Sequence, residues 1–102
     1  MYKLRNAAVV LQLLAAHPEL ASSAITWGID DRAELWPDIR HDEPTIEADA
    51  RRLADALCTS VEITPLSDER AMLTVDGTYA GVPVTLYAFP YLDDEAQSGG
   101  EG

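Results

Sequence analysis

Two histidines and one cysteine are the side chains of this chain best suited to metal binding or covalent catalysis. His17 and His41 lie far apart in the sequence, and Cys58 is the single cysteine. A zinc site needs several such ligands at close spacing, and a nucleophilic cysteine needs an activating base or a helix N-terminus. The sequence has neither pattern and lacks a glycine-rich phosphate loop followed by a helix. We therefore expect no metal ion and no cofactor, with Cys58 packed as a small apolar residue.

Acidic side chains dominate the charge of the chain. Eighteen Asp and Glu residues against seven Lys and Arg residues give a net charge of −11. This balance excludes direct binding to nucleic acid, which requires clustered cations, and it opposes an anionic membrane surface. It is compatible with a basic protein partner. The acids are densest in one predicted hairpin and its exit loop, and we call these six residues the acidic cluster: Asp30, Asp31, Glu34, Asp38, Asp42 and Glu43.

The acidic cluster allows two further hypotheses. Duplex DNA presents closely spaced negative charge, so an acidic protein could occupy the DNA-binding groove of a partner and act as an inhibitor. Alternatively, an Asp or Glu could work with His41 as the acid and base of a small enzyme. The enzyme is the least favoured hypothesis, because the sequence shows no activated nucleophile.

Three aromatic residues are expected to share one face of the predicted sheet. If the apolar residues of the strands face the helices, then Trp36, Tyr87 and Phe89 face the other way. A two-layer domain leaves that sheet face open, and grouped exposed aromatics mark interfaces. A slip of one residue in the strand register would exchange the two faces.

The spacing of apolar residues predicts the elements that position these side chains. Apolar residues at helical spacing predict a helix over residues 4–16. Its apolar surface is broad, so we expect this helix to be covered on more than one side. A second helix is predicted over 44–57, with Asp49 and Arg52 paired on its polar side. Alternation of apolar and polar residues predicts five strands, over residues 23–29, 33–40, 61–64, 73–79 and 82–89.

These elements follow the order α-β-β-α-β-β-β. We predict a two-layer α+β domain over residues 1–92, with both helices on one face of a mainly antiparallel five-stranded sheet. Ala80 and Gly81 are the preferred turn of the last hairpin, and Gly77 is a bulge or a point of close approach. Residues 93–102 are acidic and glycine-rich and are predicted to be a disordered tail.

The apolar run 7–16 follows Lys3 and Arg5 and superficially resembles a secretory signal. Gln12 interrupts the run, which is also far shorter than the roughly 20 residues that span a bilayer. We interpret it as a buried helix. Together with the single cysteine, this favours a cytoplasmic protein.

Four stretches resemble a set of small α+β proteins of unassigned function from high-GC actinobacteria, their phages or integrated elements. The matching stretches are residues 13–20, 25–27, 54–57 and 75–84. They contain a helix stop, a strand, a helix end and a hairpin, so the resemblance implies the topology and a cytoplasmic, mobile-element origin. It carries over no catalytic residue.

From these features we predict a small cytoplasmic protein-binding module. The acidic cluster would steer the partner and the three aromatics would supply affinity. The candidate partners are a basic protein and a second copy of the chain. The acidic inhibitor of a nucleic-acid-binding protein and the small enzyme are the two alternatives.

Overall fold

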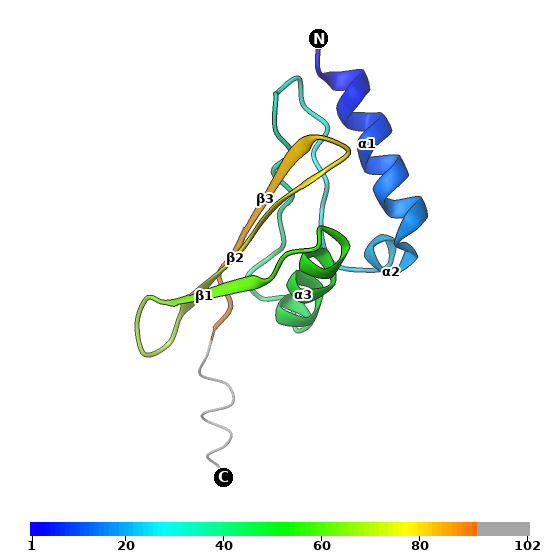
Figure 1. Ribbon diagram of the computed structural model, residues 1–102. Coiled ribbons are helices and arrows are strands. Elements are labelled where there is room, and N and C mark those ends of the chain that lie inside the picture. The colour runs from blue at the N-terminus through cyan, green and yellow to red at the C-terminus, as the bar shows by residue number, and fades with distance from the viewer. Residues whose placement is uncertain (92–102) are drawn as a thin grey trace.

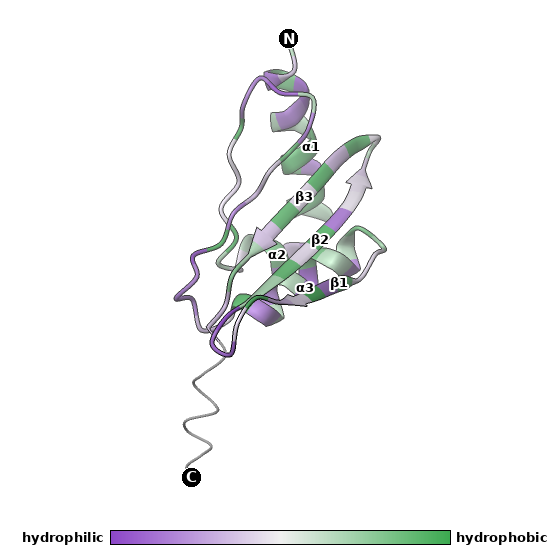
Figure 2. Cartoon of the chain, turned by 90° about the vertical axis from the view of Figure 1, so that its left-hand side faces the viewer, coloured by the Kyte–Doolittle hydropathy of each residue, from purple (hydrophilic) through white to green (hydrophobic). Residues whose placement is uncertain are grey.

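A long β-hairpin organises the structure, which is a computed structural model that describes residues 1–91. Its strands β2 and β3 join a third, β1, in the antiparallel order β1-β2-β3. Figures 1 and 2 show the helices gathered on one side of this sheet. The elements are α1 (Lys3–Ala16), α2 (Pro18–Ala21), α3 (Ile46–Ala56), β1 (Val61–Pro65), β2 (Ala71–Tyr79) and β3 (Val82–Ala88). The α+β class is confirmed, and the predicted tail 93–102 lies outside the described residues.

The hairpin turn lies at Ala80 and Gly81, as predicted. Both residues have positive φ, 53° and 79°, which suits the tight turns that match the twist of paired strands. Gly77 pairs in register with Val84, so it forms no bulge. A Cβ added to Gly77 would lie 3.1 Å from the Cβ of Leu57, so the prediction of a close approach is correct.

The prediction of five strands is wrong, because the segment from residue 23 to residue 42 forms no ladder. Thr26 and Asp38 make one antiparallel bridge, with N–H···O distances of 2.7 and 2.9 Å. Leu35 makes one parallel bridge to Val84 of β3. Pro37 has no N–H to donate, which interrupts further pairing. The segment therefore runs beside β3 as an irregular chain (Figure 1).

The side chains of this segment nevertheless alternate as predicted. Leu35, Pro37 and Ile39 are buried, whereas Trp36 and Asp38 are exposed. Burial alternates because the chain is extended along the edge of the core, and this requires no neighbouring strand on the far side. The periodicity therefore predicted the faces correctly and the hydrogen bonding incorrectly.

Two buried polar side chains attach the helices to the irregular segment. The amide of Asn6, fully buried in α1, donates to the carbonyl oxygens of Asp30 and Arg32, each at 2.8 Å. Asp49 of α3 is 1% exposed and accepts from the backbone N–H of Ala24 at 3.0 Å. These bonds satisfy backbone groups that a regular sheet would otherwise pair.

Asp49 was predicted to lie on the polar side of α3, but it is buried. The pair with Arg52 exists, at 2.6 Å, but the Asp49 carboxylate is buried and the Arg52 side chain is 45% exposed. Thr45 donates a further hydrogen bond to Asp49 at 2.7 Å. The helix begins at Ile46, two residues later than predicted, with Thr45 at its N-cap.

Candidate protein-interaction surface

An aromatic stack lies on the sheet face that the helices leave open. The rings of Trp36 and Tyr87 have centroids 5.8 Å apart and planes inclined by 28°. Their side chains are 45% and 42% exposed. These two residues were predicted to share a face, and the structure brings them into contact.

The backbone explains how residues so far apart in sequence meet. The N–H of Leu35 donates to the carbonyl oxygen of Pro83 at 2.9 Å, and Thr85 N–H donates back to Leu35 at 3.0 Å. Leu35 is buried, so Trp36 turns outward beside β3. Tyr87 turns outward because its strand alternates with a period of two.

Phe89 extends this surface along the chain. It follows Tyr87 by two residues, is 37% exposed, and lies outward between the buried residues Ala88 and Pro90. We call Trp36, Tyr87 and Phe89 the outer aromatic patch. Thr74 of β2 stands opposite Tyr87 in the sheet register and adds an uncharged neighbour.

The acidic cluster does not form one continuous surface. Asp30 and Asp31 lie beside the N-terminal end of α1, whereas Asp42 and Glu43 lie just before α3, at the other end of the segment (Figures 1 and 2). Glu34 and Asp38 lie between these ends. They flank Trp36 in the sequence at two residues on either side, and both are exposed as it is. They therefore place negative charge at the border of the outer aromatic patch.

Two carboxylates of the acidic cluster are already neutralised by cations. The terminal amino group of Met1 lies 2.8 Å from Asp31, and this hydrogen bond lowers the pKa of the Asp31 carboxyl. The Arg40 guanidinium lies 2.8 Å from Asp42, and its hydrogen bonds lower the pKa of that carboxyl as well. Both carboxylates are thus ionised at neutral pH but offer less net charge to a partner.

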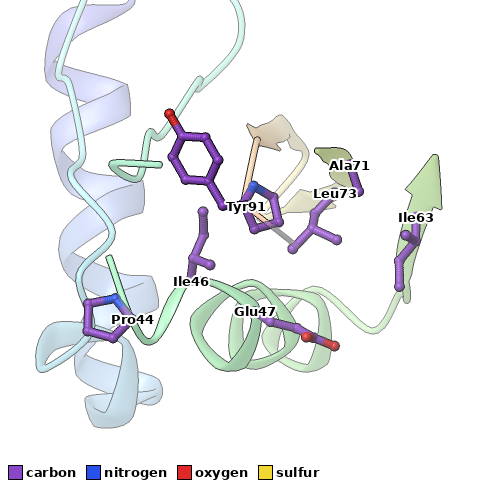
Figure 3. A pocket seen from close by; sticks show the side chains of 8 residues that line it. Pro44, Ile46, Glu47, Ile63, Ala71, Leu73 and Tyr91 are labelled. Atoms are coloured by element: carbon purple, nitrogen blue, oxygen red, sulfur yellow. The ribbon is translucent and has the colours of Figure 1, made fainter. Parts of the chain in front are cut away.

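An apolar cleft lies between α3, the sheet and the end of the described chain (Figure 3). Its volume is about 450 Å³. Ile63 of β1 lines this cleft and is 54% exposed. The residues that line the cleft include Pro44, Ile46, Ile63, Leu73, Pro90 and Tyr91.

His41 lies in a hollow that adjoins this cleft. The hollow also contains Asp42 and Glu43, and the His41 ring meets Tyr91 edge-on at 5.4 Å. A carboxyl that acts as a general acid at neutral pH needs a raised pKa. The pKa of Asp42 is instead lowered by Arg40.

His17 and Cys58 both lie where helices end. His17 follows α1, and its ring nitrogen Nδ1 lies 3.6 Å from Glu19. Cys58 is exposed, so the prediction that it packs as an apolar residue is wrong. It follows α3 with a φ of 57°, a left-handed cap that turns its side chain outward. Residues 1–91 contain no group of three or more metal-ligating side chains.

Comparison with protein-family models, curated proteins and solved structures finds no significant match for this chain. The resemblance to small actinobacterial and phage proteins therefore stays a prediction. Within residues 1–91, no helix has the length and apolar character needed to cross a membrane.

Proposed function

We propose that this protein is a protein-binding module whose partner docks on the outer aromatic patch. The observation that carries this proposal is the exposed stack of Trp36 on Tyr87. Large exposed aromatics that lie together are enriched among the residues that dominate binding energy in protein interfaces. Phe89, two residues after Tyr87 and 37% exposed, enlarges the apolar area.

The stack is suited to binding because it is already ordered before the partner arrives. Each ring restricts the other, and Trp36 is held by the backbone bridge of Leu35 to β3. Aromatic side chains have few rotatable bonds, so little conformational entropy is lost when a partner covers them. Covering the exposed parts of both rings therefore contributes directly to affinity.

The charges around the patch define the chemistry of the partner. Glu34 and Asp38 flank Trp36, and the whole chain carries a net charge of −11. We propose a partner surface with an apolar centre and a basic border. Opposite charge accelerates encounter and fixes orientation, while the apolar contact holds the complex.

The two other hypotheses lack a specific observation in their favour. The acidic inhibitor rests on the charge of the whole chain, since the acidic cluster is divided between two ends of a segment. The hypothesis of a small enzyme depends on His41 and on a nearby carboxyl group. The pKa values of the Asp31 and Asp42 carboxyls are lowered, which does not favour this role. Both stay predictions, as does the cytoplasmic location.

The test is capture of partners on the immobilised protein, with the doubly substituted variant Trp36→Ala/Tyr87→Ala as the comparison. We expect the variant to lose at least about tenfold in affinity for a captured partner, as hot-spot residues do. Tyr2→Ala is the matched control, because Tyr2 is an aromatic residue of similar exposure, 37%, in a different part of the molecule.

Thermal unfolding separates a binding role from a structural one. Trp36 and Tyr87 are nearly half exposed, so the double variant should unfold within a few degrees of the unmodified chain. Equal capture by both proteins would contradict the proposal. A large fall in the melting temperature would instead assign the stack to the core.

A further inference from the structure

The outer side of α1 carries apolar residues that nothing in the described chain covers. Leu4 is 85% exposed and Leu11 is 69% exposed. Ala8 lies between these two leucines on the same side of the helix, and Ala15 lies beyond Leu11. Both alanines are also exposed. We call Leu4, Ala8, Leu11 and Ala15 the outer stripe of α1.

The outer stripe lies opposite the side of α1 that packs into the core. Val9, Val10 and Leu13 are buried against the domain, together with Asn6. At about 100° per residue, the outer stripe is centred about half a turn of the helix away from these four residues. The prediction that α1 is covered on more than one side is thus wrong for residues 1–91 taken alone. A helix that is apolar on opposite sides is typical of a buried helix, so the outer stripe requires a cover.

Charge favours α1 as the place where two copies of this acidic chain can meet. Residues 6–16 carry no charge, and α1 has no acidic residue among its 14 residues. Two molecules of net charge −11 repel each other, and the repulsion is smallest where their contacting surfaces lack carboxylates. Lys3, at the start of α1, makes no ion pair within the described residues.

The order of side chains in the outer stripe fits a copy of itself running the other way. The stripe reads large, small, large, small from Leu4 to Ala15. Antiparallel pairing about a two-fold axis sets Leu4 against Ala15 and Ala8 against Leu11, so that each large side chain meets a small one. Parallel pairing would set leucine against leucine and leave the alanines apart. Antiparallel pairing also opposes the two helix dipoles and brings Lys3 toward the end of the partner helix that precedes Glu19.

We propose that α1 mediates an antiparallel homodimer through its outer stripe. The interface is isologous, since each copy contributes the same residues. One helix of this length offers a small contact area, so we expect a Kd on the order of 10–100 µM. The proposal does not rest on the outer aromatic patch, which belongs to a different part of the surface.

Analytical ultracentrifugation of the full chain over a concentration range tests the dimer. We expect the mass to rise from monomer to dimer across about 1 µM to 1 mM, as mass action at such a Kd requires. The variant Leu4→Gln/Leu11→Gln should stay monomeric over the same range. Leu66→Gln is the matched control, because Leu66 is an exposed leucine outside α1, and it should dimerise as the unmodified chain does.

Three results would overturn the dimer. The unmodified chain could remain monomeric at every concentration, or the double variant could dimerise undiminished. If the double variant loses its helical circular dichroism, Ala8→Glu, a substitution at an exposed position, is measured in its place. An Ala8→Glu chain that folds and still dimerises would again overturn the proposal. Trp36→Ala/Tyr87→Ala should dimerise normally, which separates this interface from the proposed binding function.

Cysteine cross-linking tests the orientation. In a Cys58→Ser background, a mixture of Leu4→Cys and Ala15→Cys chains should form a disulfide-linked heterodimer, because positions 4 and 15 face each other. Each variant alone should not cross-link, since eleven residues at about 1.5 Å rise separate the two identical positions in an antiparallel pair. Efficient self-linking of Leu4→Cys would show a parallel pair and overturn the stated geometry.

Discussion

The β2–β3 hairpin and the segment from residue 23 to residue 42 show the same alternation of buried and exposed side chains, but they are held by different means. The hairpin pairs residue by residue from Leu73–Ala88 to Tyr79–Val82. The segment has isolated bridges at Thr26 and Leu35 and otherwise depends on side chains of the helices. Distributed backbone pairing makes one region cooperative, whereas the other depends on a few individual contacts.

The largest expected effect comes from the core side of the hairpin. Leu86 is fully buried under the helices, and Leu86→Ala should lower the free energy of unfolding by about 3 kcal/mol. Chemical denaturation measures this loss. Hydrogen exchange should accelerate throughout the domain, because the cavity weakens the whole core. Faster exchange confined to the hairpin would contradict the cooperative description.

The next largest loss of stability is expected when the hydrogen bonds that attach the segment to α1 are removed. Asn6→Ala leaves the carbonyl oxygen of Asp30 without its donor and leaves that of Arg32 with only the longer bond from Arg5, at 3.3 Å, and should cost about 2 kcal/mol. We expect hydrogen exchange to accelerate first in residues 28–36, with β2 and β3 less affected. Gln12→Ala, at an exposed position of the same helix, is the control. Equal acceleration in segment and hairpin would show that the two regions unfold as one unit.

Substitutions in the hairpin turn should change the free energy of unfolding by a smaller amount, and Ala80→Gly should raise it. Ala80 adopts a positive φ of 53°, which disfavours a residue with a Cβ, so Ala80→Gly should stabilise the chain by about 0.5 kcal/mol. Gly81→Ala, at a φ of 79°, should destabilise it. Thermal unfolding of the two variants checks the pair. The same sign for both would mean that the turn differs from the one described.

The smallest effect is a dependence on pH that is confined to the segment. The pKa values of Asp31 and Asp42 are lowered by the Met1 amino group and by Arg40. Each contact therefore stabilises the fold above the ordinary carboxyl pKa, near 4, and is lost as the pH falls through the lowered value. NMR signals of residues 30–42 should change below pH 4 before those of the hairpin. Asp31→Asn and Asp42→Asn should remove the corresponding changes.

The same contrast explains which parts of the structure could be predicted from sequence. The two longer helices, the hairpin and its turn were predicted to within about two residues, because local spacing and turn chemistry determine them, whereas the short helix α2 was not predicted. The five-stranded sheet was wrong, because Asn6 and Asp49 supply hydrogen bonds from other elements, which alternation of residues 23–40 does not reveal. Gly28 and Pro37 were the local signals against a ladder of backbone hydrogen bonds, because glycine weakens a strand and proline has no N–H to donate.

The candidate surface was predicted in part for a similar reason. Alternation placed Trp36 and Tyr87 on one face, although their contact depends on the bridge of Leu35 to β3. The division of the acidic cluster was already implied by the predicted hairpin, which sets Asp30 at its turn and Asp42 beyond the other end of its second strand. The exposure of Leu4 and Leu11 was also missed, because apolar spacing alone does not say which side of a helix the domain covers.

The bridge between Leu35 and Val84 also has a kinetic consequence. It joins residues about fifty positions apart in the chain, whereas the hairpin closes around a two-residue turn, and closing a longer loop carries a larger entropic cost. The bridge also needs β3 as its template. We therefore expect the hairpin to form before the rate-limiting step of folding and the segment to settle afterwards, so that Trp36 reaches its place beside Tyr87 last.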